Sequence, residues 1–311
     1  MKTRILITGA PGNVGTEVVH ELQRLGVPFR VGAYHVKAAI KILSDDLEIT
    51  HFDFLKPETY AAAFAGIERM FLVRPPALSN VQRDIAPAIE AAVKAGVKQI
   101  VFLSIQGVEN NRVVPHYKIE QLLLGSGVDY TFLRASFFMQ NLSTTHRSEI
   151  RDHNEIALPV GHARTSFIDA RDIAAVAARV LTEAGHTNQK YTLTGDEALD
   201  YDQVASKLSA TLHRTIRYTH PSIITFIRRQ LALGQKLGYT LIMTALYTIT
   251  RFGNAKTVTH DVEMLLGRPP ISFDQFAEDY RSSWQPDAAL ETAPDMHSPA
   301  SDTQPALLTN K

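Results

Sequence analysis

The first fifteen residues contain the feature that most restricts the fold of this chain. An apolar run, Ile5-Leu6-Ile7-Thr8, leads directly into Gly9-Ala10-Pro11-Gly12-Asn13-Val14-Gly15, and a helical pattern begins at once. Glycines at this spacing let the backbone turn tightly after a strand and approach a pyrophosphate, which the N-terminus of the following helix attracts. A glycine triplet alone also fits an ordinary turn, but the order of strand, turn and helix predicts a dinucleotide-binding site.

Strand and helix patterns alternate through the first half of the chain. The strand candidates are β-branched and apolar runs at residues 4–8, 29–33, 48–53, 69–73, 99–104 and 129–134. Helical candidates lie between them, at residues 14–25, 60–65, 85–95 and 117–124. Such alternation indicates βαβ units, so we predict an α/β fold with a Rossmann-type doubly wound parallel sheet.

The pattern becomes mainly helical from about residue 186. A short strand candidate at 191–193 precedes helical patterns at 201–212, 221–252 and 273–284, while the helix at 170–181 is expected to return to the main sheet. We therefore expect a dinucleotide-binding Rossmann domain over residues 1–185 and a smaller, mostly helical substrate lobe over 186–284. Residues 285–311 are rich in proline and polar residues without apolar periodicity, which predicts a disordered tail.

Composition and residue spacing exclude several kinds of function. Lys and Arg together number 32, Asp and Glu also number 32, and no basic block occurs, so no nucleic-acid partner is expected. The absence of cysteine excludes disulfides, thiolate metal sites and cysteine nucleophiles. No metal site is expected either, because the histidines lack metal-ligand spacing with neighbouring carboxylates. The histidines considered are His51, His146, His153, His162, His186, His213, His220 and His260.

Neither end of the chain nor its interior contains a pattern typical of membrane targeting. The N-terminus lacks the apolar stretch and small-residue cleavage site of a signal peptide. The longest uncharged apolar stretch, residues 237–249, is shorter than the roughly 20 residues of a membrane-spanning helix and fits a buried helix. We expect a cytoplasmic monomer or homodimer that acts on a small molecule and has no membrane partner.

The end of the second strand bears on the choice between NAD and NADP. NAD-specific sites place an Asp or Glu there, about 20 residues after the glycines, on the ribose 2′-hydroxyl. Here the segment reads Arg30-Val-Gly-Ala-Tyr-His-Val-Lys37, and no carboxylate follows until Asp45. His35 and Lys37, with Arg30 directed to the same place, would supply positive charge for a 2′-phosphate, although a single lysine at a helix start is commonly only solvated. NADP(H) is the favoured cofactor, with NAD(H) as the alternative.

An ordered series of further segments makes the chain similar to a known family. The segments are the turn at 8–15, Asp53, Phe71-Leu-Val-Arg-Pro-Pro76, and residues 97–104, 116–120, 130–134, 137–141, 168–174, 191–195 and 267–284. In this order they resemble the NmrA-like branch of atypical short-chain dehydrogenases. That branch contains quinone reductases, triphenylmethane and azo-dye reductases, and redox sensors without known catalysis.

The resemblance places Asp53 and Phe54 beside the adenine and residues 73–76 along the nicotinamide half. Combined with the glycine turn, it predicts one set of cofactor-binding residues at the carboxyl ends of the strands. The set is Thr8, Gly9, Pro11, Gly12, Asn13, Val14, Gly15, Tyr34, His35, Lys37, Asp53, Phe54, Val73, Arg74, Pro75, Ser104 and His116.

The residues expected to carry the chemistry depart from the usual short-chain dehydrogenase pattern. Such enzymes combine a serine with Tyr-x-x-x-Lys, in which the tyrosine donates the proton. Ser104 is retained here, but Arg112 and His116 stand at the tyrosine and lysine positions, and Tyr117 is out of register. We predict Ser104 and His116 as the catalytic residues, with Glu120 one helical turn on to orient the imidazole. The alternative is a half-exposed histidine in a weak surface pair.

Losing the tyrosine favours acceptors that delocalise the charge of an incoming hydride, such as a quinone, a dye cation or an iminium. We predict an NAD(P)H-dependent reductase of a small conjugated acceptor. Alternatives are a non-catalytic NADP(H)-binding redox sensor and a dehydrogenase for one biosynthetic metabolite. The candidate substrate-lining residues are mainly aromatic and apolar, a composition that also suits a core. They are Phe137, Phe138, Met139, Asn141, Tyr239 and Met243, with Tyr247 at the same helical spacing.

Overall fold

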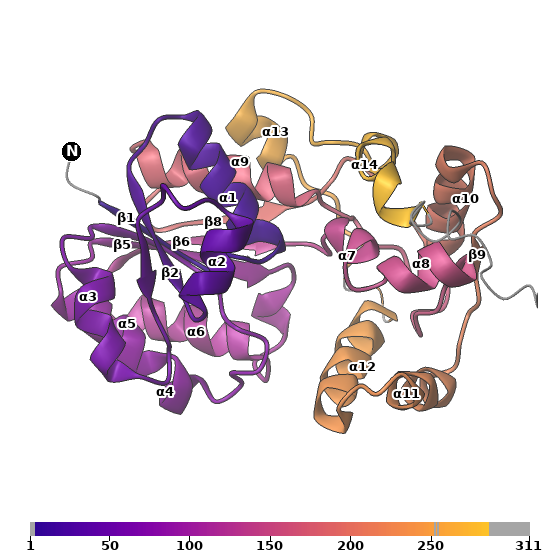
Figure 1. Ribbon diagram of the computed structural model, residues 1–311, viewed down its shortest axis with the longest axis horizontal. Coiled ribbons are helices and arrows are strands. Elements are labelled where there is room, and N and C mark those ends of the chain that lie inside the picture. The colour runs from indigo at the N-terminus through magenta and orange to yellow at the C-terminus, as the bar shows by residue number, and fades with distance from the viewer. Residues whose placement is uncertain (1–3, 252, 254, 286–311) are drawn as a thin grey trace, which may run out of the picture.

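The central element of the computed structural model is a parallel sheet of seven strands (Figure 1). The structure describes residues 4–251, 253 and 255–285, without the side chains of Tyr239 and Ile249, so residues 286–311 of the predicted tail lie outside it. The order across the sheet is β3 (Ile49–His51), β2 (Phe29–Ala33), β1 (Ile5–Thr8), β4 (Arg69–Leu72), β5 (Gln99–Ile105), β6 (Asp129–Ala135) and β8 (Gln189–Leu193). The strand order reverses between β1 and β4, and ligands of open α/β sheets bind at such a point, outside the carboxyl ends of the strands.

Helices cover both faces of this sheet because alternate strand residues point to opposite sides. Ile5 and Ile7 pack under helices on one face, whereas Leu6 packs under helices on the other. The first face carries α1 (Asn13–Arg24), α2 (Val36–Ile42), α9 (Ala170–Thr182) and α13 (Asp261–Leu266). The second carries α3 (Tyr60–Phe64), α4 (Val81–Asp84), α5 (Ala86–Lys94) and α6 (Pro115–Gly125), with short 3-10 turns at Pro57–Thr59 and Val108–Asn110.

A second, mainly helical lobe has its own apolar core, which contains the fully buried Trp284, Tyr201 and Phe276. The Trp284 indole N–H donates to the carbonyl of Leu142 at 2.9 Å, which fixes the last turn of the lobe. The lobe consists of α7 (Gln140–Ser143), α8 (Arg147–His153), β7 (Glu155–Ile156), α10 (Tyr201–Leu212), β9 (Arg217–Tyr218), α11 (Ile223–Ala232), α12 (Leu237–Arg251), α14 (Phe273–Asp279) and a 3-10 turn (Arg281–Trp284). β7 and β9 pair in parallel.

The chain passes between the two lobes more often than the sequence analysis predicts. The strand predicted for the second lobe at 191–193 is part of β8, which pairs with β6 in the main sheet, so that assignment is wrong. Conversely, α7, α8 and β7 pack in the second lobe although they precede residue 185. The statement that residues 1–185 and 186–284 form two separate folding units stays a prediction. The long helical pattern after residue 221 is two helices separated at Gly234, whose φ is +80°.

A set of polar contacts around the buried Asp169 and Gln140 joins the two lobes. The Gln140 side chain donates to Asp169 Oδ1 at 2.7 Å and accepts from the backbone N–H of Ala170 at 2.8 Å. Arg171 bridges the fully buried Asp169 at 2.8 Å and Asp279 at 2.6 Å, and these partners raise the pKa of its guanidinium. We name Gln140, Asp169, Arg171 and Asp279 the interlobe clasp. Among the described helices, none has both the length and the apolar character needed to cross a bilayer.

Candidate cofactor and substrate site

The glycine turn after β1 has no room for side chains at its three glycines. Gly9 has a φ of +79°, and a Cβ there would lie 2.6 Å from the Cβ of Val73, which directly follows the neighbouring strand β4. A Cβ on Gly12 would lie 2.7 Å from the Gly9 carbonyl oxygen, and one on Gly15 would lie 2.5 Å from the same atom. The backbone of the turn is therefore packed against itself and against the end of β4, as close approach to a diphosphate requires.

Thr8 fixes this turn to the neighbouring strand. Its buried hydroxyl donates to the Phe71 carbonyl at 2.9 Å and accepts from the Val73 N–H at 2.9 Å. The end of β1 and the end of β4 are thus joined through one side chain. The hydroxyl of Thr8 is already engaged in these two bonds, so the direct contact of Thr8 with a cofactor stays a prediction.

The N-terminus of α1 is arranged to receive an anion. Its cap, Gly12, provides no side-chain hydrogen bond, and its first turn holds no acidic residue. Asn13 donates across to Asn141 Oδ1 at 3.4 Å and Thr144 Oγ1 at 3.3 Å. Val14 is 4% exposed and belongs to the core, so only its backbone faces the turn. Uncapped N–H groups and the helix dipole, beside a cradle that a Cβ would fill, fit the diphosphate of a dinucleotide.

Three exposed side chains follow β2, and two of them, His35 and Lys37, are basic. Tyr34, His35 and Lys37 are exposed, the Tyr34 and His35 rings lie 4.3 Å apart, and the first turn of α2 holds no acidic residue. Arg30 does not join them as the sequence analysis expects. Its guanidinium donates to Glu48 at 2.5 Å and to backbone carbonyls at the end of α3, because β2 directs residue 30 to that side.

The residues predicted beside the adenine are largely buried. Asp53 Oδ1 accepts from the Leu55 N–H at 2.9 Å, while the Asp53 N–H donates to Thr59 Oγ1 at 3.2 Å, so the carboxylate shapes the turn after β3. Phe54 is 7% exposed and its ring lies 4.8 Å from that of Phe52. The Phe54 side chain mainly fills the core beneath this edge, and its contact with a nucleotide stays a prediction.

Arg74 contributes a partly buried cation after β4. Its Nη1 donates to the carbonyls of Pro75, Pro76 and Leu78 at 2.9, 3.0 and 3.1 Å, so the arginine folds the proline segment around itself. Burial lowers the pKa of Arg74. Its Nε is buried and finds no hydrogen-bond acceptor among the described residues, which leaves one donor at this edge for a ligand.

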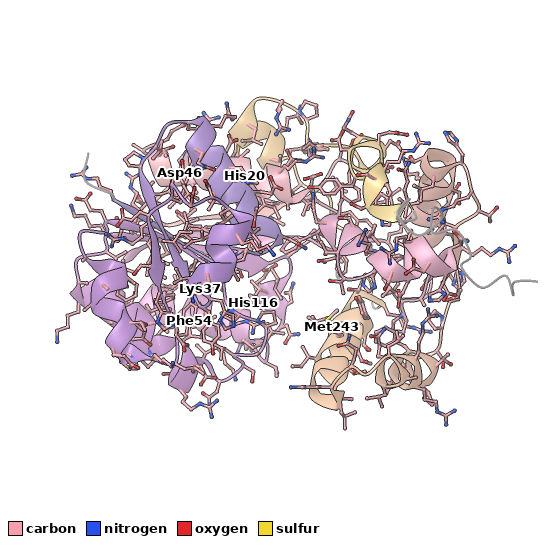
Figure 2. All side chains as sticks on the ribbon, in the orientation of Figure 1. His20, Lys37, Asp46, Phe54, His116 and Met243 are labelled. Atoms are coloured by element: carbon pink, nitrogen blue, oxygen red, sulfur yellow. The ribbon has the colours of Figure 1, made fainter. Side chains whose placement is uncertain are left out.

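His116, near the start of α6, is a neutral imidazole. Its ring stacks on Phe102 at a centroid distance of 5.9 Å, and protein atoms surround most of it although part of the side chain is exposed. Burial first, and the charge of Arg74 second, lower the pKa of His116 to about 3. The ring therefore carries no charge at neutral pH and offers one N–H and one lone pair. Figure 2 shows His116, Lys37 and Phe54 on the sheet lobe.

Glu120 does not orient His116, contrary to the prediction from helical spacing. Its buried carboxylate accepts from Ser104 Oγ at 2.7 Å and from Arg134 in a bidentate pair at 3.0 and 2.7 Å. Arg134 also pairs with Glu109 at 3.0 Å. Ile119 and Leu123 turn this side of α6 onto the sheet, which takes Glu120 inward.

This network also engages Ser104, which is 1% exposed. The geometry does not bring its hydroxyl to the site surface, so its catalytic role stays a prediction without structural support. Sequence reasoning missed Arg134 and Glu109 as members. The available signal was an acid on the apolar side of a helix, because a buried carboxylate requires a partner.

The predicted substrate-lining residues divide into two groups. Phe137, Phe138, Asn141 and Met243 are partly exposed, and Met243 lies on α12 where that helix faces the sheet lobe (Figure 2). Met139 is 2% exposed inside the second core, because its N–H bonds to the Ile168 carbonyl and turns the residue inward, so its assignment to a pocket is wrong.

Tyr239 and Tyr247 of α12 also belong to the predicted substrate residues. Tyr247 is buried, and its hydroxyl lies 2.9 Å from His146 Nε2, which makes it a core residue. The side chain of Tyr239 lies outside the described residues. The roles of Phe137, Phe138, Asn141 and Met243 in a substrate site stay predictions.

Comparisons with known proteins identify relatives of this chain in sequence and in fold. The sequence model of the NmrA-like family matches residues 1–266. The NAD(P)H azoreductase of Xenophilus azovorans is 33% identical over 284 residues, which cover 90% of this chain and 99% of that protein. The festuclavine dehydrogenase of Aspergillus fumigatus is 30% identical over 296 residues, covering 90% and 98%. The Citrobacter sp. triphenylmethane reductase complexed with NADP(H) has the same fold, with a TM-score of 0.77, 24% identity, and coverage of 90% and 99%.

Substituting Gly15→Ala should lower the affinity for NADPH at least about 100-fold, which corresponds to about 2.7 kcal/mol. The added methyl group would collide with the Gly9 carbonyl and push α1 away from the turn. Calorimetric titration with NADPH measures the effect. Gly125→Ala is the matched control, since nothing lies within 4 Å of its Cβ position, and it should bind normally. Should Gly15→Ala fail to fold, Gly12→Ala tests the same contact, and normal binding by a folded variant contradicts this account.

His116 should make the protein less stable in mild acid. The unfolded chain takes up a proton near pH 6.5, whereas the folded protein holds the pKa of His116 at about 3, so this contribution is complete above pH 6.5 and is lost as the pH falls toward 3. Between pH 7 and 5, wild-type protein should lose about 1 to 2 kcal/mol more unfolding free energy than His116→Gln. Urea titrations at both pH values provide the measurement. The exposed His20 supplies the control His20→Gln, which should behave as wild type; equal losses in His116→Gln and wild type argue against a neutral His116.

Proposed function

Because this chain belongs to the NmrA-like family, we propose that it is an NADPH-dependent reductase that transfers hydride to a small conjugated acceptor. One observation carries the proposal. The glycine cradle and the buried donor of Arg74 lie at the same edge of the sheet as a histidine that is neutral at working pH. This arrangement favours binding and orientation of a dinucleotide without a strong proton donor beside it.

We expect three regions of the chain to bind three parts of the cofactor: its diphosphate, its 2′-phosphate and its nicotinamide half. The N–H groups at the start of α1 would hold the diphosphate, and Lys37 with His35 would receive the 2′-phosphate after β2. Arg74 Nε would donate to a polar group of the nicotinamide half, and His116 would hydrogen bond there as a neutral ring. When bound, NADPH supplies the hydride, and water supplies the proton that completes the reduction.

The proposed class of acceptor follows from the lack of a strong proton donor in the chain. No Tyr-x-x-x-Lys occurs anywhere in the sequence, and a group with a pKa of about 3 cannot donate as an imidazolium near pH 7. A quinone, an azo or triphenylmethane dye, or an iminium spreads the charge of the incoming hydride over its conjugated system and needs no matched acid. The names of the azoreductase and festuclavine dehydrogenase relatives support this class.

The remaining contacts of the acceptor would be apolar. Phe137 and Met243 are partly exposed beside the core of the second lobe, and Phe138 is partly exposed beside the core of the sheet lobe. Flat aromatic acceptors pack well on such side chains. We propose that the protein works in the cytoplasm as a monomer or homodimer, with small-molecule partners and without nucleic acid.

The proposed activity is tested by following NADPH absorbance with a panel of quinones, azo dyes, a triphenylmethane dye and a cyclic iminium. Acceptor-dependent oxidation of NADPH, with the reduced product identified, is the expected result. Tight binding of NADPH without turnover on any acceptor would overturn the reductase proposal and favour the redox-sensor alternative.

Lys37→Glu should weaken NADPH binding at least about 10-fold, or about 1.4 kcal/mol, while changing NADH binding much less. The reason is that a carboxylate at the end of β2 repels a 2′-phosphate and suits a free 2′-hydroxyl. Lys41→Glu is the matched control, because it makes the same charge change at an exposed site in the last turn of the same helix. Dissociation constants for both dinucleotides decide the matter, and equal effects of the two variants would contradict a role for Lys37.

A further inference from the structure

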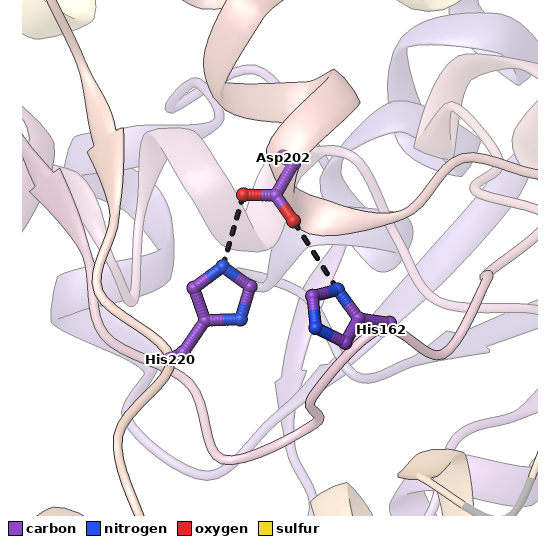
Figure 3. Close-up of side chains that lie close together, drawn as sticks. All are labelled: His162, Asp202 and His220. Atoms are coloured by element: carbon purple, nitrogen blue, oxygen red, sulfur yellow. Dashed lines mark hydrogen bonds and ion pairs between the residues drawn. The ribbon is translucent and has the colours of Figure 1, made fainter.

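Two histidines and an aspartate meet on the surface of the second lobe, on elements that do not form the dinucleotide site (Figure 3). His162 lies on the segment that follows β7, Asp202 in the first turn of α10, and His220 just after β9. The three residues are distant in sequence, so the spacing rule that excluded a metal site could not detect them. The fold, rather than a local motif, brings them together.

The separations between the three side chains suit a common metal ion. His220 Nε2 lies 3.0 Å from Asp202 Oδ1, and His162 Nδ1 lies 3.5 Å from Asp202 Oδ2. One ligand atom from each residue falls within 4.8 Å of the others. Ligands that each lie about 2.0–2.2 Å from a tetrahedral zinc ion are roughly 3.3 Å from one another, so small side-chain rotations would complete the geometry.

The two imidazoles also lie close to each other, with their planes tilted by 47°. Their ring centroids are 4.8 Å apart, and each ring addresses a different oxygen of the one carboxylate. A metal ion at this place would take one nitrogen from each ring and one oxygen from the carboxylate as ligands.

The site rests on rigid parts of the lobe. The His220 ring centroid lies 4.1 Å from that of Tyr218, whose hydroxyl donates to the Leu158 carbonyl at 2.7 Å. His220 has a φ of +45°, a conformation that costs energy in a residue with a side chain and that persists here beside the carboxylate. Asp202 is held by the capping box of Asp200 and Gln203 at the start of α10.

We propose that His162, Asp202 and His220 bind one divalent transition-metal ion, with Zn²⁺ preferred, and that water completes its coordination. Two imidazole nitrogens and one carboxylate oxygen suit zinc, nickel or copper, whereas magnesium and calcium prefer oxygen ligands throughout. The bound ion joins three segments of the second lobe and therefore stabilises that lobe. The exposed ligands and the positive charge of Arg251, close to Gly161, make the site weaker than an enclosed four-ligand zinc site.

The direct test is calorimetric titration of the full chain, without a polyhistidine tag, with zinc chloride. Wild-type protein should bind one zinc ion, and His162→Ala and His220→Ala should each lower the affinity at least about 10-fold, since each removes one of three ligands. His260→Ala is the matched control. His260 is also an exposed histidine beside a carboxylate, with its Nδ1 3.5 Å from Glu263 Oε2, but it belongs to no group of three ligands in the described chain.

A thermal-unfolding measurement gives an independent readout. Zinc should raise the midpoint of wild-type protein and of His260→Ala, but not that of His220→Ala, and magnesium should have no such effect. Absence of zinc binding by wild-type protein overturns the proposal. Equal zinc affinity in wild type, His162→Ala and His220→Ala overturns it as well. Equal midpoints of the metal-free proteins would show that the substitutions leave the fold intact.

Discussion

The structure depends on the contact between the Gly9 carbonyl and the backbone of α1. Gly12 and Gly15 approach that carbonyl so closely that a Cβ at either position would lie under 3 Å from it. This contact sets where α1 starts and which way it leaves the sheet. Thr8 then transmits the position of the turn to the end of β4 through two hydrogen bonds of 2.9 Å. The glycine turn and the proline segment after β4 are therefore held in position by the same set of local contacts.

Neighbouring strands extend that arrangement into a site. Because β1 lies between β2 and β4, the carboxyl ends of these strands bring Lys37, the glycine turn and Arg74 to one edge. His116 completes the edge from α6, and its burial, together with the charge of Arg74, keeps its ring neutral. Binding a dinucleotide requires contacts spread along such an edge, whereas the chemistry proposed here requires little from any single acid or base.

Sequence reasoning succeeded where a residue's role is decided locally. The glycine turn, the first six strands of the sheet and the helical nature of the second lobe follow from patterns of a few residues, and the structure confirms them. It failed where distant segments compete for the same residue. Glu120 has the right helical spacing for His116, but Ser104 on β5 and Arg134 on β6 provide better partners for a buried carboxylate. Helix α2 went unpredicted because Ala39 is its one buried residue, which leaves almost no periodic signal.

The interlobe clasp has a consequence for how the two lobes can move. Rotating one lobe away from the other would separate Gln140 from the fully buried Asp169, and a buried polar group that loses its partner costs about 1–3 kcal/mol. The same rotation would break the more exposed pair of Arg171 and Asp279. Polar contacts therefore restrain α7 and α14 relative to α9, in addition to the apolar packing within each lobe.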